Sequence, residues 1–117
     1  MSLKGLLAEL QVEYLATFPE KIMRMDSLWR SGKLQELASE FHKIKGTGRT
    51  YGIPEVTVVG EALEALVEMN HSQLNQAVPA ALYVLEQIRK ARSAGRELKL
   101  EHEAQFVMIS GLLSRPD

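Results

Sequence analysis

The segment FHKIKGTGRTYGIP, residues 41–54, decides how the middle of the chain folds. A histidine, His42, is followed within ten positions by Gly46, Gly48 and Gly52. A glycine inside a helix costs about 1 kcal/mol relative to alanine, so these glycines need a reason to be there. The last of them is a typical residue for a helix end. The spacing therefore predicts a helix that runs through the histidine and ends near Tyr51.

Apolar residues recur every three or four positions through most of the chain, which predicts helices. The five stripes are Leu3, Leu6, Leu7, Leu10 and Tyr14; Ile22, Met25, Leu28 and Trp29; Leu34, Leu37, Phe41, Ile44 and Gly48; Val56, Val59, Leu63 and Leu66; and Val78, Leu82, Leu85 and Ile88. Ser31-Gly32 and Gly95 are expected to end helices. The residues Asn70-His71-Ser72 are expected to form a loop.

Two segments give a mixed signal. VTVV, residues 56–59, is rich in β-branched residues and locally favours a strand. We predict a helix there, because Pro54-Glu55 is a good helix start and the apolar period continues beyond it. QFVMI, residues 105–109, fits either a strand or a short helix that packs back on the other helices.

The predicted fold is all-α: an antiparallel four-helix bundle with an additional N-terminal helix and a short C-terminal helix. Residues 1–117 are expected to form a single domain, with 96–117 as a C-terminal extension. The chain could stand alone or be one domain of a larger protein.

Composition narrows the function. The formal net charge is −1 with both signs mixed, which argues against a surface devoted to nucleic acid or anionic membrane. The chain has no cysteine, so disulfides and thiolate metal sites are excluded. No apolar run approaches the roughly 18 residues that span a bilayer. We expect a cytoplasmic protein without nucleic-acid or membrane partners, a monomer rather than a dimer.

The exposed face of the predicted helix carries a chemical pattern. His42 lies about 100° around the helix from the apolar Phe41, so its imidazole should face water. Lys45, Gly46 and Arg49 share that face. A neutral imidazole has a free nitrogen lone pair and can attack an electrophilic phosphorus. Lysine and arginine would lie beside the resulting anionic group, while glycine would let another protein approach the backbone.

Each of these residues also has a plain explanation. Most surface histidines have no special role, and cations near the end of a helix complement its dipole. Glycines near a helix end simply terminate it. These explanations account for the residues separately and less well for their combination.

The same residues resemble the signature of the histidine-containing phosphotransfer (HPt) domain. That signature has a histidine, any residue, an aliphatic residue, lysine, glycine, two small residues, and a glycine ten positions after the histidine. The matching residues are His42, Ile44, Lys45, Gly46, Thr47, Gly48 and Gly52, and Leu63-Glu64 matches the "LE" that usually follows. The resemblance covers about residues 6–92. It departs at Phe41, commonly alanine, and at Thr47-Gly48, commonly serine or alanine.

The resemblance implies a phosphorelay intermediate of two-component signal transduction. His42 would accept a phosphoryl group from a receiver-domain aspartyl phosphate and pass it to another receiver. Lys45 would orient the phosphoryl group, and Lys43, Gly46 and Arg49 would contact the partner, a response-regulator receiver or a hybrid histidine kinase. No independent catalysis and no cofactor are expected, because Mg²⁺ would be held by the receiver.

Two other readings stay open. The chain could be a helical adaptor that kept the shape without relay activity. A basic cluster at residues 89–99 could contact nucleic acid, although it lacks interleaved aromatic residues and reads more simply as a solvated helix end. His71 and His102 are too far apart in sequence for a recognised metal-ligand spacing, so no metal site is expected. The methionines at 23, 25 and 69 are expected to pack in the bundle.

Overall fold

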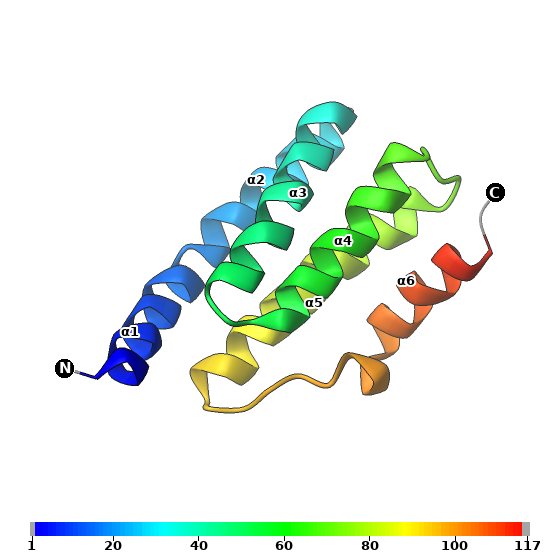
Figure 1. Ribbon diagram of the computed structural model, residues 1–117. Helices are drawn as coiled ribbons and strands as arrows, with labels where there is room; N and C mark the ends of the chain where they lie inside the picture. Colours follow the sequence, from blue (N-terminus) through cyan, green and yellow to red (C-terminus); the bar gives the residue numbers. More distant parts are fainter. Residues whose placement is uncertain (1, 116–117) are drawn as a thin grey trace.

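The computed structural model describes residues 2–115, and all regular structure in this part of the chain is helical. The elements are α1 (Leu3–Ala16), α2 (Phe18–Arg30), α3 (Leu34–Thr50), α4 (Pro54–Glu68), α5 (Leu74–Ser93), a 3₁₀ turn (Leu100–His102) and α6 (Ala104–Ser114). Helices α2 to α5 form the four-helix bundle, α1 continues beyond one end of it, and α6 packs against α4 and α5 (Figure 1). The predicted fold class is confirmed.

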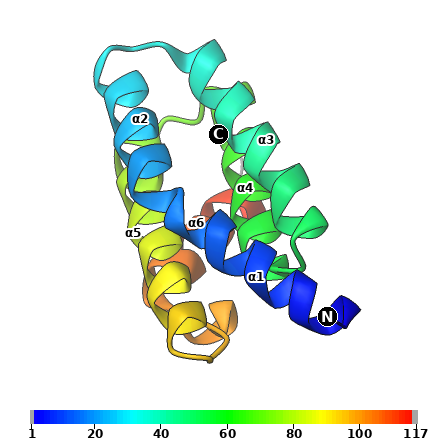
Figure 2. The ribbon, with the colours of Figure 1, turned by 90° about the vertical axis from the view of Figure 1, so that its left-hand side faces the viewer.

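The helices end where the sequence predicts. Gly32, Gly52 and Gly95 adopt positive φ angles of 70°, 71° and 73° just after α2, α3 and α5. Glycine has no Cβ to clash in this conformation, so each can reverse the chain. The turns at Gly32 and Gly52 are short, which makes α3 antiparallel to α2 and α4 antiparallel to α3 (Figure 2).

Both ambiguous segments are helical. The β-branched residues Val56, Thr57 and Val59 lie in α4 and are buried against the bundle, where tertiary packing outweighs the local strand preference. The segment 105–109 lies in α6, and its Ile109 is fully buried. The C-terminal helix therefore packs back on the bundle.

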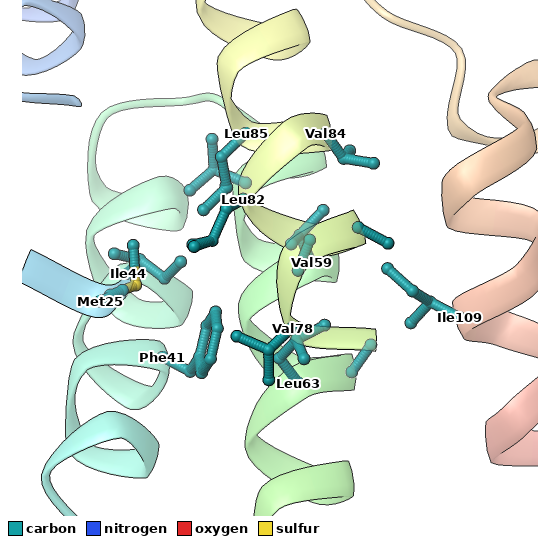
Figure 3. Close-up of a cluster of buried hydrophobic side chains, with 14 of the residues drawn as sticks. Met25, Phe41, Ile44, Val59, Leu63, Val78, Leu82, Val84, Leu85 and Ile109 are labelled. Carbon is teal, nitrogen blue, oxygen red and sulfur yellow. The ribbon is translucent and has the colours of Figure 1, made fainter. Parts of the chain in front are cut away.

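A single core runs between the helices. Met25, Phe41, Ile44, Leu63 and Leu85 come from four different helices and meet at its centre (Figure 3). Phe41 is fully buried, so the residue that departs from the family signature fills the core and points away from the site surface.

Some sequence expectations about burial are wrong. Met25 is buried, but Met23 and Met69 are 72% and 44% exposed, so these two methionines do not pack in the core. The leucine stripe of α1 is also largely exposed, because the first half of that helix runs past the end of the bundle. Among the stripe residues only Tyr14 reaches the core, and its neighbour Leu15 is buried with it.

Candidate functional site

His42 lies in the middle of α3 with its imidazole on the outside. Its side chain is 69% exposed, whereas Phe41 and Ile44 on either side of it are buried. The apolar stripe of α3 turns toward the core and thereby turns the histidine outward. The ring is accessible to another protein.

A carboxylate from the next helix supports the ring. The Oε2 atom of Glu64 in α4 lies 2.5 Å from Nδ1 of His42, and its Oε1 atom accepts a hydrogen bond of 2.9 Å from Nζ of Lys45. The side chain of Glu64 is only 14% exposed, while that of Lys45 is 30% exposed. Glu64 thus connects the histidine with the lysine one turn further along.

Two small residues bring α4 close enough for this contact. A Cβ atom on Gly60 would lie 2.8 Å from both the backbone nitrogen of Lys45 and the carbonyl oxygen of Phe41. A Cβ atom on Gly48 would lie 2.6 Å from Oγ1 of Thr57. The backbones of α3 and α4 therefore approach more closely than two side chains would allow. The glycines at 48 and 60 are there for packing.

Two neighbouring side chains, those of Lys45 and His42, influence the charge state of Glu64. The hydrogen bond from Lys45, and after it the one from His42, hold the pKa of the Glu64 carboxyl below its ordinary value, although partial burial opposes this. An ionised carboxylate can only accept hydrogen bonds. A neutral His42 ring must then carry its proton on Nδ1, which leaves the lone pair on Nε2.

The remaining predicted residues surround the ring. Gly46 is exposed, and a Cβ atom there would meet nothing within 4 Å, so this patch of backbone is open. Arg49 is exposed one turn further on. Lys43 lies 3.7 Å from Glu40, which also accepts a hydrogen bond of 2.8 Å from Arg24 in α2. The structure therefore places Lys43, Lys45, Gly46 and Arg49 around the imidazole on the outer face of α3.

Glu64 is the residue whose function the sequence did not reveal. Within four residues of His42 the only acidic residue is Glu40, which lies on another face of the helix. The only signal was the Leu63-Glu64 pair, quoted as part of a resemblance. A contact between residues 22 positions apart depends on how α3 and α4 pack, and periodicity within one helix does not specify that.

Two arginines of the basic cluster at residues 89–99 are engaged within the protein, whereas Lys90, Arg96 and Lys99 are exposed. Arg92 forms two hydrogen bonds, of 2.7 and 2.6 Å, with the buried carboxylate of Glu55, and Arg89 pairs with Glu86. The cluster is therefore not simply a solvated helix end, since Arg92 neutralises a buried charge. This use of the arginines weakens the nucleic-acid reading.

The other two histidines lie away from this site. His71 is buried in the turn between α4 and α5, where its Nδ1 accepts a hydrogen bond of 3.0 Å from the backbone of Gln73. His102 is exposed in the 3₁₀ turn. Within residues 2–115 there is no group of three or more His, Cys, Asp or Glu side chains that could hold a metal ion. No helix in the same range is long and apolar enough to cross a membrane.

The fold and the site together define a helical bundle that presents one supported histidine at its surface. The Hpt domain model matches residues 9–104, and the chain belongs to the Hpt domain family. Proteins of this family carry out histidine phosphotransfer in two-component phosphorelays, where they interact with receiver domains and histidine kinases. Comparisons with curated proteins and with solved structures each found no match.

Proposed function

We propose that the protein is a phosphorelay intermediate that accepts a phosphoryl group on His42 from a receiver-domain aspartyl phosphate and passes it to a second receiver. The observation that carries this proposal is the exposed imidazole whose Nδ1 faces an ionised carboxylate. That arrangement leaves Nε2, directed away from Glu64, as the nucleophilic atom.

The transfer is a displacement at phosphorus. The Nε2 lone pair of His42 forms the N–P bond while the O–P bond to the receiver aspartate breaks, and the electron pair leaves with the receiver carboxylate. The ring becomes positively charged because its Nδ1 proton stays in place. Glu64 accepts the hydrogen bond from that N–H and faces the new charge, which lowers the barrier electrostatically.

Lys45 and Arg49 supply positive charge for the transferred phosphoryl group. Lys45 is one turn from the ring and partly exposed, so its ammonium can turn from Glu64 toward a phosphoryl oxygen. Arg49 offers a second cation on the same face. The Mg²⁺ ion that phosphoryl transfer commonly uses belongs to the receiver in this proposal. The protein is thus a phosphate carrier without activity of its own.

The docking surface follows from what is open around His42. Gly46 lets the receiver backbone approach α3, and Lys43 and Arg49 frame the gap. On the adjoining helix α2, Arg24 bonds to Glu40 next to this face, and the neighbouring Met23 is exposed. We expect Met23 to be the apolar contact at the edge of this surface.

Transfer of a labelled phosphoryl group tests the proposal. A phosphorylated receiver should label the protein in an acid-labile form, and His42→Gln should abolish the label. His102→Gln, which changes an exposed histidine elsewhere, is the matched control and should label normally. Glu64→Gln should slow labelling by roughly a factor of ten or more, because a neutral amide can hydrogen-bond either tautomer of the ring and carries no negative charge to stabilise the ring cation.

Two results would reject the proposal. Label retained in His42→Gln would place the acceptor elsewhere. No label from any receiver, with the protein still folded, would favour the adaptor reading, in which the bundle keeps the shape of the family without the relay.

A further inference from the structure

The first half of α1 presents an uncovered apolar stripe. Leu3, Leu6, Leu7 and Leu10 are 87%, 44%, 41% and 37% exposed. They occupy the same helix face as Tyr14, which is buried. The face that anchors the end of α1 to the bundle therefore continues for two turns with little of the chain against it.

A second apolar surface lies between α4 and α6. The start of α4, the connecting segment between α5 and α6 (residues 94–103) and α6 enclose a groove of about 660 Å³. Its apolar lining residues are Pro54, Val58, Leu98, Leu100, Phe106 and Val107. Val58 and Val107 are 42% and 52% exposed. The groove is large enough to take the side chains of a docked helix.

Helix α6 borders the groove on one side. The helix, Ala104–Ser114, contains no charged residue; Ile109 is fully buried, and Phe106, Met108, Leu112 and Leu113 are half-buried against the core. The exposed side carries the polar Gln105, Ser110 and Ser114 together with Val107. Of these exposed residues, Val107 and Ser110 line the groove.

Both surfaces lie at the same end of the molecule. Leu7 would be 4.0 Å from a Cβ atom on Gly52, and Pro54, two residues further on, lines the groove. The start of α1, the α3–α4 turn and the connecting segment lie together at the lower end in Figures 1 and 2. Leu3, Leu6 and Leu7 precede the family match, and α6 extends beyond it, so neither surface is explained by the shared phosphotransfer site.

We propose that the protein forms a two-fold symmetric dimer in which α1 of each copy lies in the groove of the other. In such a dimer the contact between α1 and the groove forms twice, because each copy contributes both the helix and the groove. A specific interface buries about 800 Å² on each partner, and two such contacts suit that requirement better than one. The expectation of a monomer is incompatible with this proposal, and the same measurement decides between them.

The charged residues beside the α1 stripe and those at the groove are also complementary. Lys4 flanks the leucine stripe of α1, and the exposed Glu97 and Glu101 line the groove. Glu9 flanks the opposite side of the stripe, and Lys99 is also at the groove. A docked α1 can thus place opposite charges along both edges of its apolar face.

Sedimentation velocity or light scattering on the whole chain, from about 1 to 100 μM, tests the proposal. We expect a concentration-dependent dimer. Leu6→Glu and Val107→Glu should each raise the dissociation constant about tenfold to a hundredfold, because each places a charge in an apolar contact. Val12→Glu is the matched control: it changes an apolar residue of the same helix that is 68% exposed on the opposite face, and association should not change.

A charge exchange identifies the partner surface. Lys4→Glu and Glu101→Lys should each weaken the dimer, and the double variant should restore it. Helical circular dichroism confirms that each variant is folded. A monomer at every concentration overturns the proposal, as does a dimer that Leu6→Glu dissociates while Val107→Glu leaves it intact, since that pattern means α1 pairs with α1. The dimer should persist in His42→Gln. Failure of the dimer proposal can therefore be distinguished from failure of the phosphorelay proposal.

Discussion

Helices α3 and α1 carry similar apolar stripes, but the stripe of α3 is buried and most of the stripe of α1 is exposed. In α3, Leu37, Phe41 and Ile44 are at most 2% exposed, whereas the first four leucines of α1 (Leu3, Leu6, Leu7 and Leu10) are at least 37% exposed. The difference lies in the neighbour and not in the stripe. Helix α4 lies directly against α3 across Gly48 and Gly60, while the first half of α1 extends past the bundle.

This comparison separates two kinds of information. A helical period predicts a helix and the face that it would bury. It does not say whether another element exists to cover that face. Where the cover exists, as at α3 and α4, it also assembles the site, because Glu64 reaches His42 only across a close helix contact.

The largest expected difference between the two regions is in leucine truncation. Leu63→Ala in α4 should lower the free energy of unfolding by about 2–5 kcal/mol, because Leu63 is fully buried and its removal leaves a cavity. Leu6→Ala in α1 should change it by no more than about 0.5 kcal/mol in the monomer. Urea unfolding at low protein concentration, followed by the fluorescence of Trp29, measures both. Equal losses would show that α1 is packed in solution.

Glycine substitution sharpens the comparison within α3 and α4. Gly60→Ala should cost about 1–3 kcal/mol, because its new methyl group meets the backbone of α3. Gly46→Ala, on the open side of α3, should be neutral or stabilise the protein by up to about 1 kcal/mol. Thermal unfolding of the two variants is the measurement. If Gly60→Ala is as stable as the parent, the backbones of α3 and α4 do not approach as closely as described above.

The smallest effect concerns the pH dependence of stability. The pKa of Glu64 is lowered in the folded state, chiefly by Lys45, so its ionised form stabilises the fold above the unfolded-state pKa of about 4.3. This contribution is lost as the pH falls through the folded-state pKa. The stability difference between the parent and Glu64→Gln should therefore shrink between about pH 5 and pH 3.

A control makes this pH experiment specific. Glu61→Gln removes an exposed carboxylate from the same helix. The stability difference between the parent and Glu61→Gln should depend less on pH than that between the parent and Glu64→Gln. A difference between the parent and Glu64→Gln that stays constant across this range would mean that the carboxylate is not held by Lys45 and His42.

Much of the fold could be predicted from local signals. Gly32, Gly52 and Gly95 end helices because positive φ angles suit glycine, and Pro54 begins one because its fixed φ suits a first turn. The outward orientation of His42 follows from the position of Phe41 and the helical period. These features depend on residues a few positions apart.

The site was predictable only in part. Lys43, Lys45, Gly46 and Arg49 share the surface of His42 by helix geometry. Their roles in phosphotransfer remain proposals. The roles of Glu64 and of the packing glycine Gly60 were not predicted, because the residues that they contact lie in another helix.

By itself, the sequence determined that the chain forms helices, where most of them end, and that an imidazole, an ammonium and a bare backbone share one surface. Those properties arise from dihedral preferences and from a repeat of 3.6 residues, which act over short distances along the chain. Only the tertiary structure decided that Glu64 supports His42, that Arg92 neutralises Glu55, and that the leucines in the first half of α1 are left uncovered. Those outcomes depend on which surfaces meet in space, and contacts across 20 or more residues are set by the packing of the whole bundle.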